Sequence, residues 1–204
     1  MGVKERKLRE FKKRGEDILL AAYNLLINLE PSQMTMEMIA QKAEIGRGTI
    51  YKHFKSKDEI YIHLILKRRE QYIIKLKNLL KEETNLLEKL INSYILYATE
   101  DKTAFYVHKK SMNSYIRSNI DKNLLNSLEL QEIEKINLVK SIMEKAFKEL
   151  NLESPNINYL IYAGWGMLRG AMNFMLETHI NDENLDQNLF IDTVKQIFLS
   201  GIKN

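Results

Sequence analysis

Apolar residues recur at helical spacing along most of this 204-residue chain. The first clear stretch covers residues 15–29, where the spacing i, i+3, i+4, i+7 marks the buried side of an amphipathic helix. Its apolar members are Ile18, Leu19, Ala22, Leu25, Leu26 and Leu29. Pro31 lacks the N–H that a continuing helix needs, so we predict that this helix ends before it.

Two short helices are predicted next. Thr35 is a good N-cap for a helix through Lys42, because its side-chain oxygen can accept a hydrogen bond from a first-turn N–H. The buried side of this helix would hold Met36, Ile39, Ala40 and Ala43. The other is expected from about residue 46 or 47 to residue 53 or 54. Such a pair, packed on a preceding helix, forms a helix-turn-helix, whose second helix enters the major groove of DNA.

A long fourth helix is predicted after this pair. Ser56 and Glu59 have the spacing of a capping box, and the helical pattern then continues to about Lys81. At about 1.5 Å per residue this helix would be roughly 35 Å long and could connect two domains. Breaks divide the rest of the chain into five more helical segments, near residues 83–85, 100–102, 118–121, 151–155 and 181–184. The predicted fold is all-α, with about nine helices.

Composition agrees with this fold class. Hydrophobic residues make up 45% of the chain, enough for a sizeable core, and the two prolines and eight glycines favour long helices over tight turns. There is no cysteine, which excludes disulfides and thiolate chemistry. No apolar run reaches the roughly 18 to 20 residues of a membrane helix, and the N-terminus does not resemble a secretion signal, so we expect a cytoplasmic protein.

Positive charge is concentrated near the N-terminus. Residues 1–57 carry 12 Lys and Arg against 7 Asp and Glu, whereas the remainder carries 19 against 20. Seven of the cations lie in residues 1–14, which we interpret as a basic arm, partly helical and continuous with the helix that follows. Such asymmetry indicates an anionic partner for the N-terminal part, although a solvated basic arm would explain it equally well.

The helix-turn-helix region also resembles a known family. Residues 35–61, TMEMIAQKAEIGRGTIYKHFKSKDEIY, are similar to the TetR family of bacterial transcription regulators, whose pattern is T-x-x-x-I-A-x-x-A-G-V-S-x-G-T-L-Y-x-H-F-x-S-K-E-x-L. The residues that match by type and spacing are Thr35, Ile39, Ala40, Ala43, Gly48, Thr49, Tyr51, His53, Phe54, Ser56 and Lys57. The resemblance covers about residues 12–72, which we interpret as the DNA-binding domain with its motif at 35–54. Residues 73–204 would then bind a ligand and dimerise.

The resemblance and the residue chemistry together predict eight DNA-binding residues. They are Thr35, Arg47, Gly48, Thr49, Tyr51, Lys52, His53 and Lys57. The two threonines can offer donors to phosphates, and Lys57 matches a family lysine that contacts the DNA backbone. Arg47 can bond guanine O6 and N7 bidentately, or bind a phosphate only. Tyr51 and His53 carry donors on the side away from the core, although they could be ordinary solvated side chains.

The turn departs from the family pattern. Glu44-Ile45-Gly46 stands where the family has Gly-Val-Ser. A left-handed backbone would cost Glu44 about 1 to 2 kcal/mol relative to glycine, so either the turn differs or packing offsets that cost. Gly46 replaces the serine cap at a loss of only a few tenths of a kcal/mol. The charge of Glu44 would lie close to DNA and weaken binding.

The C-terminal region suggests a dimer interface. In residues 158–177 one helical stripe is small and the opposite one is bulky, so this helix is expected to be buried on two sides. In the TetR family the last two long helices of each subunit form a four-helix interface. By this resemblance the candidate dimerisation residues are Tyr159, Ala163, Gly166, Gly170, Phe190, Val194, Ile197 and Phe198.

A ligand pocket is expected between the long fourth helix and the bulky stripe of residues 158–177. Aromatic residues and methionines line adaptable apolar sites, although the same residues can equally be plain core. The candidates are Tyr94, Tyr97, Phe105, Tyr115, Trp165, Met172 and Met175.

These features predict a DNA-binding transcription regulator. We expect a repressor that binds a palindromic operator as a homodimer and is released by a largely apolar small molecule. The alternative is a TetR-like interaction or ligand-sensing protein with weak or no specific DNA binding. No enzyme motif is found, and no cofactor or metal is expected. The four histidines are scattered along the sequence, and the glycines of residues 164–170 lie within a helix pattern, unlike a dinucleotide loop.

Overall fold

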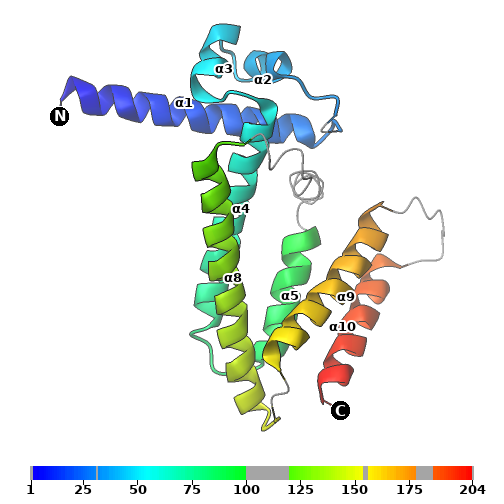
Figure 1. Cartoon of the computed structure of the whole chain (residues 1–204). Helices are drawn as coiled ribbons and strands as arrows, with labels where there is room; N and C mark the ends of the chain where they lie inside the picture. Colours follow the sequence, from blue (N-terminus) through cyan, green and yellow to red (C-terminus); the bar gives the residue numbers. More distant parts are fainter. Residues whose placement is uncertain (1, 31, 100–119, 154–155, 178–185, 204) are drawn as a thin grey trace. The chain divides into compact units, whose positions relative to one another are not determined.

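A computed structural model describes residues 2–30, 32–99, 120–153, 156–177 and 186–203 (Figure 1). These residues form eight helices and no strand, which confirms the all-α prediction for the described part. About nine helices were expected for the whole chain. The expected helix between residues 102 and 118 lies outside the described residues. No helix in the described ranges is long and apolar enough to cross a membrane.

The chain divides into two compact units. The first comprises residues 1–69 and 102–129. Its described part holds α1 (Val3–Leu26), α2 (Met36–Lys42), α3 (Arg47–His53) and the first portions of α4 (Lys57–Leu79) and α8 (Lys122–Glu149). The side chains at the centre of its core have no exposed surface: Ile18, Met34, Ile39, Ile50, Ile60, Tyr61 and Ile62. The guanidinium of Arg69, which is also buried, donates a hydrogen bond to the carbonyl of Leu128 at 2.8 Å.

Helix α1 differs from the helix predicted for residues 15–29 at both ends. It begins at Val3, so described residues 3–14 of the expected basic arm are fully helical and continuous with it. It ends at Leu26, three residues early, because the N–H of Asn28 bonds the carbonyl of Leu25 and tightens the chain into a turn.

The starts of α2, α3 and α4 follow their predicted caps. The Thr35 hydroxyl oxygen accepts a hydrogen bond from the N–H of Met38 at 3.2 Å, and α3 follows Gly46 directly. The Ser56 hydroxyl oxygen accepts from the N–H of Glu59 at 3.2 Å. The Glu59 carboxylate accepts from the N–H of Lys55 rather than that of Ser56, so the capping box is displaced by one residue.

The second unit comprises residues 70–101 and 130–204. It holds the remaining portions of α4 and α8 together with α5 (Leu86–Thr99), α9 (Ile157–Glu177) and α10 (Gln187–Lys203). Its core is built mainly on leucine, isoleucine and aromatic residues, among them Tyr72, Leu76, Leu86, Ile91, Ile142, Phe147 and Ile161.

Side chains near the end of α8 form hydrogen bonds with the turn between α4 and α5. Lys145 donates to the carbonyl of Glu82 at 2.6 Å and pairs with the Glu83 carboxylate at 3.1 Å. One turn later, the Glu149 carboxylate accepts from the N–H groups of Asn85 at 2.6 Å and Leu86 at 3.2 Å. A lysine therefore satisfies free carbonyls at the end of α4, and a glutamate satisfies free N–H groups at the start of α5.

Candidate DNA-binding surface and effector cavity

The turn between α2 and α3 keeps the left-handed residue that the family pattern implies. Glu44 has φ +53° although it is not glycine. The next N–H, that of Ile45, bonds the carbonyl of Ala40 at 2.9 Å, and the Ile45 side chain packs against the core. These contacts hold the turn in place, so the strain stays at Glu44 and the angle between the two helices is preserved.

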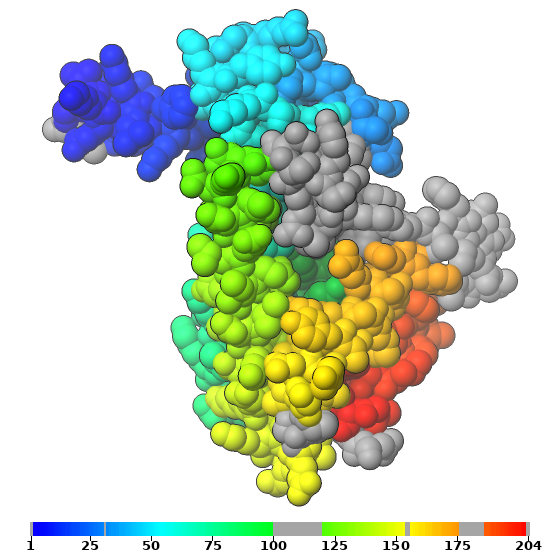
Figure 2. All heavy atoms as spheres, viewed as in Figure 1, coloured from blue at the N-terminus to red at the C-terminus, as the bar shows by residue number. Residues whose placement is uncertain are grey.

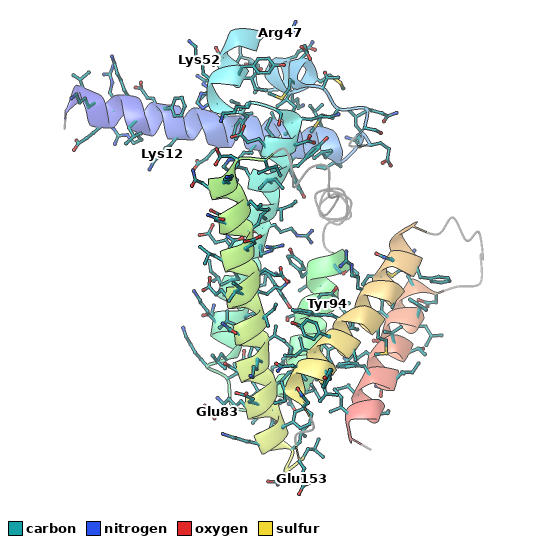
Figure 3. All side chains as sticks on the ribbon, in the orientation of Figure 1. Lys12, Arg47, Lys52, Glu83, Tyr94 and Glu153 are labelled. Atoms are coloured by element: carbon teal, nitrogen blue, oxygen red, sulfur yellow. The ribbon has the colours of Figure 1, made fainter. Side chains whose placement is uncertain are left out.

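Most of the predicted DNA-binding residues lie on the exposed side of this motif. Those that are exposed are Thr35, Arg47, Gly48, Tyr51 and Lys52, while Thr49, His53 and Lys57 are half-buried. Arg47 and Lys52 both project from α3 in Figure 3. A Cβ added at Gly48 would meet no atom within 4 Å, so no packing contact of the unit requires a glycine there.

Arg47 is paired with an acidic residue that sequence reasoning missed. Its guanidinium lies 2.8 Å from the carboxylate of Glu37 in the first turn of α2, and both side chains are largely exposed. Pairs at such exposure contribute little to stability, so Arg47 can leave Glu37 for DNA at small cost. Only the folded turn brings the two together, because they are ten positions apart in sequence.

His53 and Lys57 make contacts within the first unit. The His53 ring stacks on Phe11 of α1, with ring centroids 4.0 Å apart. Burial lowers the pKa of His53, and the positive charge of Arg14 lowers it further. Lys57 donates a hydrogen bond to the carbonyl of Met34 at 3.1 Å. Both residues thus help to hold the motif, whatever they contribute to DNA binding.

The second unit has a small, partly open apolar cavity of about 40 Å³. Five helices contribute to its lining, which consists of Tyr72, Leu87, Leu90, Ile91, Tyr94, Val139, Met143, Leu160, Ile161, Gly164, Trp165, Leu168 and Phe198. Two predicted ligand-binding residues, Tyr94 and Trp165, are among them. Most of the others are aliphatic residues that a sequence cannot separate from ordinary core.

The other predicted pocket residues are placed differently. Tyr97 stacks on Tyr72 with centroids 4.4 Å apart. Met172 is fully buried and Met175 half-buried, and neither lines this cavity. Phe105 and Tyr115 lie outside the described residues.

Polar groups lie close to Tyr94 and Trp165, two aromatic residues of the cavity lining. The Lys135 ammonium lies 4.7 Å from the centre of the Trp165 ring and 2.8 Å from the Glu132 carboxylate. Burial raises the pKa of Tyr94, while the nearby charge of Arg169 opposes this shift. Figure 3 shows Tyr94 projecting from α5. The site therefore combines an apolar interior with a tyrosine hydroxyl, the cations of Lys135 and Arg169, and the Glu132 carboxylate that pairs with Lys135.

The predicted dimerisation residues differ in their exposure. Tyr159, Ala163, Gly166 and Gly170 form an exposed stripe on α9, and Ile197 is exposed on α10. Phe190 is half-buried, with its ring 5.6 Å from that of Phe174. Val194 and Phe198 instead pack against the core of their own unit. Val194 and Phe198 lie on the apolar side of α10, and this side is covered by the core of their own chain.

A glycine outside the predicted stripe, Gly164, lets α9 and α10 approach each other within the unit. A Cβ added at Gly164 would lie 2.6 Å from carbon atoms of the Phe198 ring. A Cβ at Gly166 or Gly170, the small residues of the predicted stripe, would meet nothing within 4 Å. The close approach within the unit thus depends on Gly164, which leaves the stripe on α9 open.

In the described ranges, no group of three or more His, Asp or Glu side chains could hold a metal ion.

The exposed helix-turn-helix and the separate all-helical unit with its cavity define the chain as a DNA-binding transcription regulator. Residues 18–64 match the family model of the bacterial regulatory proteins of the tetR family. The chain therefore carries a DNA-binding domain of the TetR type.

The similarity to other proteins extends beyond the helix-turn-helix domain. The fatty acid metabolism regulator protein of Bacillus subtilis is 23% identical over 194 residues, covering 92% of this chain and 94% of the relative. An HTH-type transcriptional regulator of Staphylococcus aureus is 25% identical over 170 residues, covering 77% and 87%. The structure of FadR from Bacillus subtilis in complex with stearoyl-CoA superposes with a TM-score of 0.69 at 20% identity, covering 92% of this chain and 98% of FadR.

Proposed function

We propose that this regulator is a repressor that binds a palindromic operator as a homodimer and is released by a long-chain acyl-CoA. The observation that best supports this proposal is the apolar cavity of the second unit, which has a tyrosine and cations beside it. The likeness to fatty acid regulators, one of them solved with stearoyl-CoA, supports the choice of ligand. An apolar cavity suits the acyl chain, and Lys135 and Arg169 suit the anionic coenzyme.

On the DNA side, α3 would enter the major groove. Arg47 would read a guanine once it leaves Glu37, and Tyr51 and Lys52 would contact phosphates. Thr35 and Thr49 would offer donors at the starts of α2 and α3. The exposure of α3 supports these roles.

The dimer would form through the exposed stripe of α9 together with the outer side of α10. Tyr159 is 74% exposed and Ile197 60% exposed in the single chain, which leaves apolar surface on both helices for a second copy to cover. The open glycines Gly166 and Gly170 would let a second copy approach closely. A twofold dimer would present two copies of α3 to the two halves of a palindrome. Sedimentation that shows a monomer at micromolar concentration would contradict this arrangement.

The cavity has to open to accept an acyl chain. A volume of about 40 Å³ is room for roughly three waters, far less than a stearoyl chain needs. The ligand would therefore bind an expanded state of the second unit and stabilise that state relative to the closed one.

Selection of bound sequences from random duplexes tests the proposal, followed by titration of the selected duplex complex with stearoyl-CoA. We expect a palindrome and its release by stearoyl-CoA but not by coenzyme A alone. The variant Leu160→Phe adds volume to the cavity lining and should bind the same duplex while resisting release. Release of both proteins at the same ligand concentration would locate the effector site elsewhere. Selected sequences that are no better than random DNA would refute the operator.

A further inference from the structure

Helix α1 is longer than its unit needs. Its first buried residue is Ile18, and the family match also begins at residue 18. Residues 3–14 therefore add about three exposed helical turns before the part that packs. In Figures 1 and 2 the first turns of this blue segment extend beyond α2 and α3. Exposed helical turns of this kind contribute little to folding, so another reason for them is needed.

This extension is strongly basic. It carries seven cations against two anions, Glu5 and Glu10. The cations are Lys4, Arg6, Lys7, Arg9, Lys12, Lys13 and Arg14. Its net charge of +5 equals the net charge of the first 57 residues, 12 cations less 7 anions. A surface of this sign fits a polyanion.

The extension is attached directly to the recognition helix. Phe11 stacks on His53, the last residue of α3, at 4.0 Å and with only 19° between the ring planes. Lys4 and Lys7 precede Phe11 by seven and four residues, so they lie on the same side of α1 as that stack. Lys12 projects from the other side in Figure 3. Lys13, two positions from Phe11, also lies on another side of the helix.

We propose that the extension is a second DNA contact, in which Lys4 and Lys7 bind phosphates beside the groove that α3 occupies. At about 1.5 Å per residue they lie roughly 10 and 6 Å along α1 from Phe11. Each DNA strand carries a phosphate about every 3.4 Å of axis, so flexible ammonium groups at this spacing meet separate phosphates. The inference rests on the proposed binding of a dimer to an operator.

An anionic membrane is the rival partner, because Val3, Leu8 and Phe11 are exposed apolar side chains on this helix. The stack of Phe11 on His53 favours DNA. It fixes the extension to the element that meets the duplex, whereas insertion of Phe11 into lipid would break that contact.

The test compares two matched double variants, Lys4→Gln with Lys7→Gln and Lys12→Gln with Lys13→Gln. Affinity for the selected operator is measured across salt concentrations. Each lost phosphate contact reduces the slope of log affinity against log salt by about 0.9. Two contacts in each of two protomers should make the slope of the first variant shallower by roughly 3.6, and the second variant should stay close to wild type. Circular dichroism checks that both retain α1.

Each other outcome has its own meaning. A wild-type slope in the Lys4 and Lys7 variant, with operator binding intact, overturns this inference and leaves the proposed function standing. Equal decreases of the salt slope in the two variants would mean that the extension acts only through its overall positive charge. That result would also overturn this inference. Loss of binding to phosphatidylserine vesicles with an unchanged DNA slope would assign the extension to membranes. A wild-type chain with no preferred duplex refutes the proposed function itself.

Discussion

At the scale of single residues, two acidic side chains distinguish this DNA-binding surface. Glu44 holds a left-handed backbone in the turn, and Glu37 pairs with Arg47 on the recognition helix. Both place negative charge where phosphates would approach. The structure keeps the family's turn, so the expected effect of these residues is on affinity rather than on the fold.

Substitution of Glu44 separates strain from charge. Glu44→Gly removes the steric cost of about 1 to 2 kcal/mol but adds about 0.5 to 1 kcal/mol of chain entropy. Thermal unfolding should therefore show a net gain of up to about 1.5 kcal/mol, together with tighter operator binding. Glu44→Gln keeps the strain and removes only the charge, so it should tighten binding without a gain in stability. Equal stability of the glycine and glutamine variants would mean that the turn relaxes the strain.

The recognition helix should divide into residues that read bases and residues that bind phosphates. Arg47→Ala should weaken binding and relax preference at one base pair by about 1 to 3 kcal/mol, because a guanidinium contact to guanine is lost. Tyr51→Ala should weaken binding about equally for all sequences. Selection from random duplexes with each variant measures both effects. Unchanged sequence preference in the Arg47 variant would place Arg47 among the phosphate contacts.

At the scale of elements, local signals predicted the first unit well. Thr35, Gly46 and Ser56 each precede a helix, and a cap acts within one turn, so the sequence around it is sufficient. The end of α1 was predicted three residues too late. The turn at Leu25 depends on a hydrogen bond between backbone groups, which the side-chain pattern does not reveal.

Long-range contacts were not predictable in the same way. The partners of Glu149 on α8 lie more than 60 positions away, and the cavity lining comes from five helices. Helical periodicity tells which side of α9 or α10 is apolar, but not whether its own chain or a second copy covers it. For that reason Phe198 was assigned to the dimer, whereas it packs beside Gly164.

The two glycines Gly164 and Gly166 offer a matched pair within α9. A Cβ at Gly164 would overlap the Phe198 ring, and overpacking of this kind typically costs about 1 to 3 kcal/mol. Gly166→Ala meets no atom of its own chain and should gain up to about 1 kcal/mol from helix propensity when unfolding is measured at a concentration where the chain is monomeric, because Gly166 lies on the proposed dimer stripe. Thermal unfolding should place Gly164→Ala below Gly166→Ala, and Phe198→Leu should rescue the former. Equal stabilities would show that the ring moves aside freely.

At the scale of the whole molecule, regulation is a coupling between operator and effector. If an acyl-CoA weakens operator binding by some factor, the operator must weaken acyl-CoA binding by the same factor. This equality holds whatever path connects the two sites. It also separates true coupling from displacement of DNA by the detergent action of an acyl-CoA.

The chain contains one tryptophan, and Trp165 lines the cavity, so its fluorescence can report the effector directly. We expect stearoyl-CoA to change this fluorescence with a higher Kd when saturating operator is present. The ratio of the two Kd values should equal the ratio of operator affinities measured with and without ligand. Leu160→Phe should raise the ligand Kd while leaving the ligand-free operator affinity unchanged, because it acts on the cavity alone. Operator release without a matching shift of the ligand Kd would mean that the ligand acts by disrupting the protein rather than by selecting one of its states.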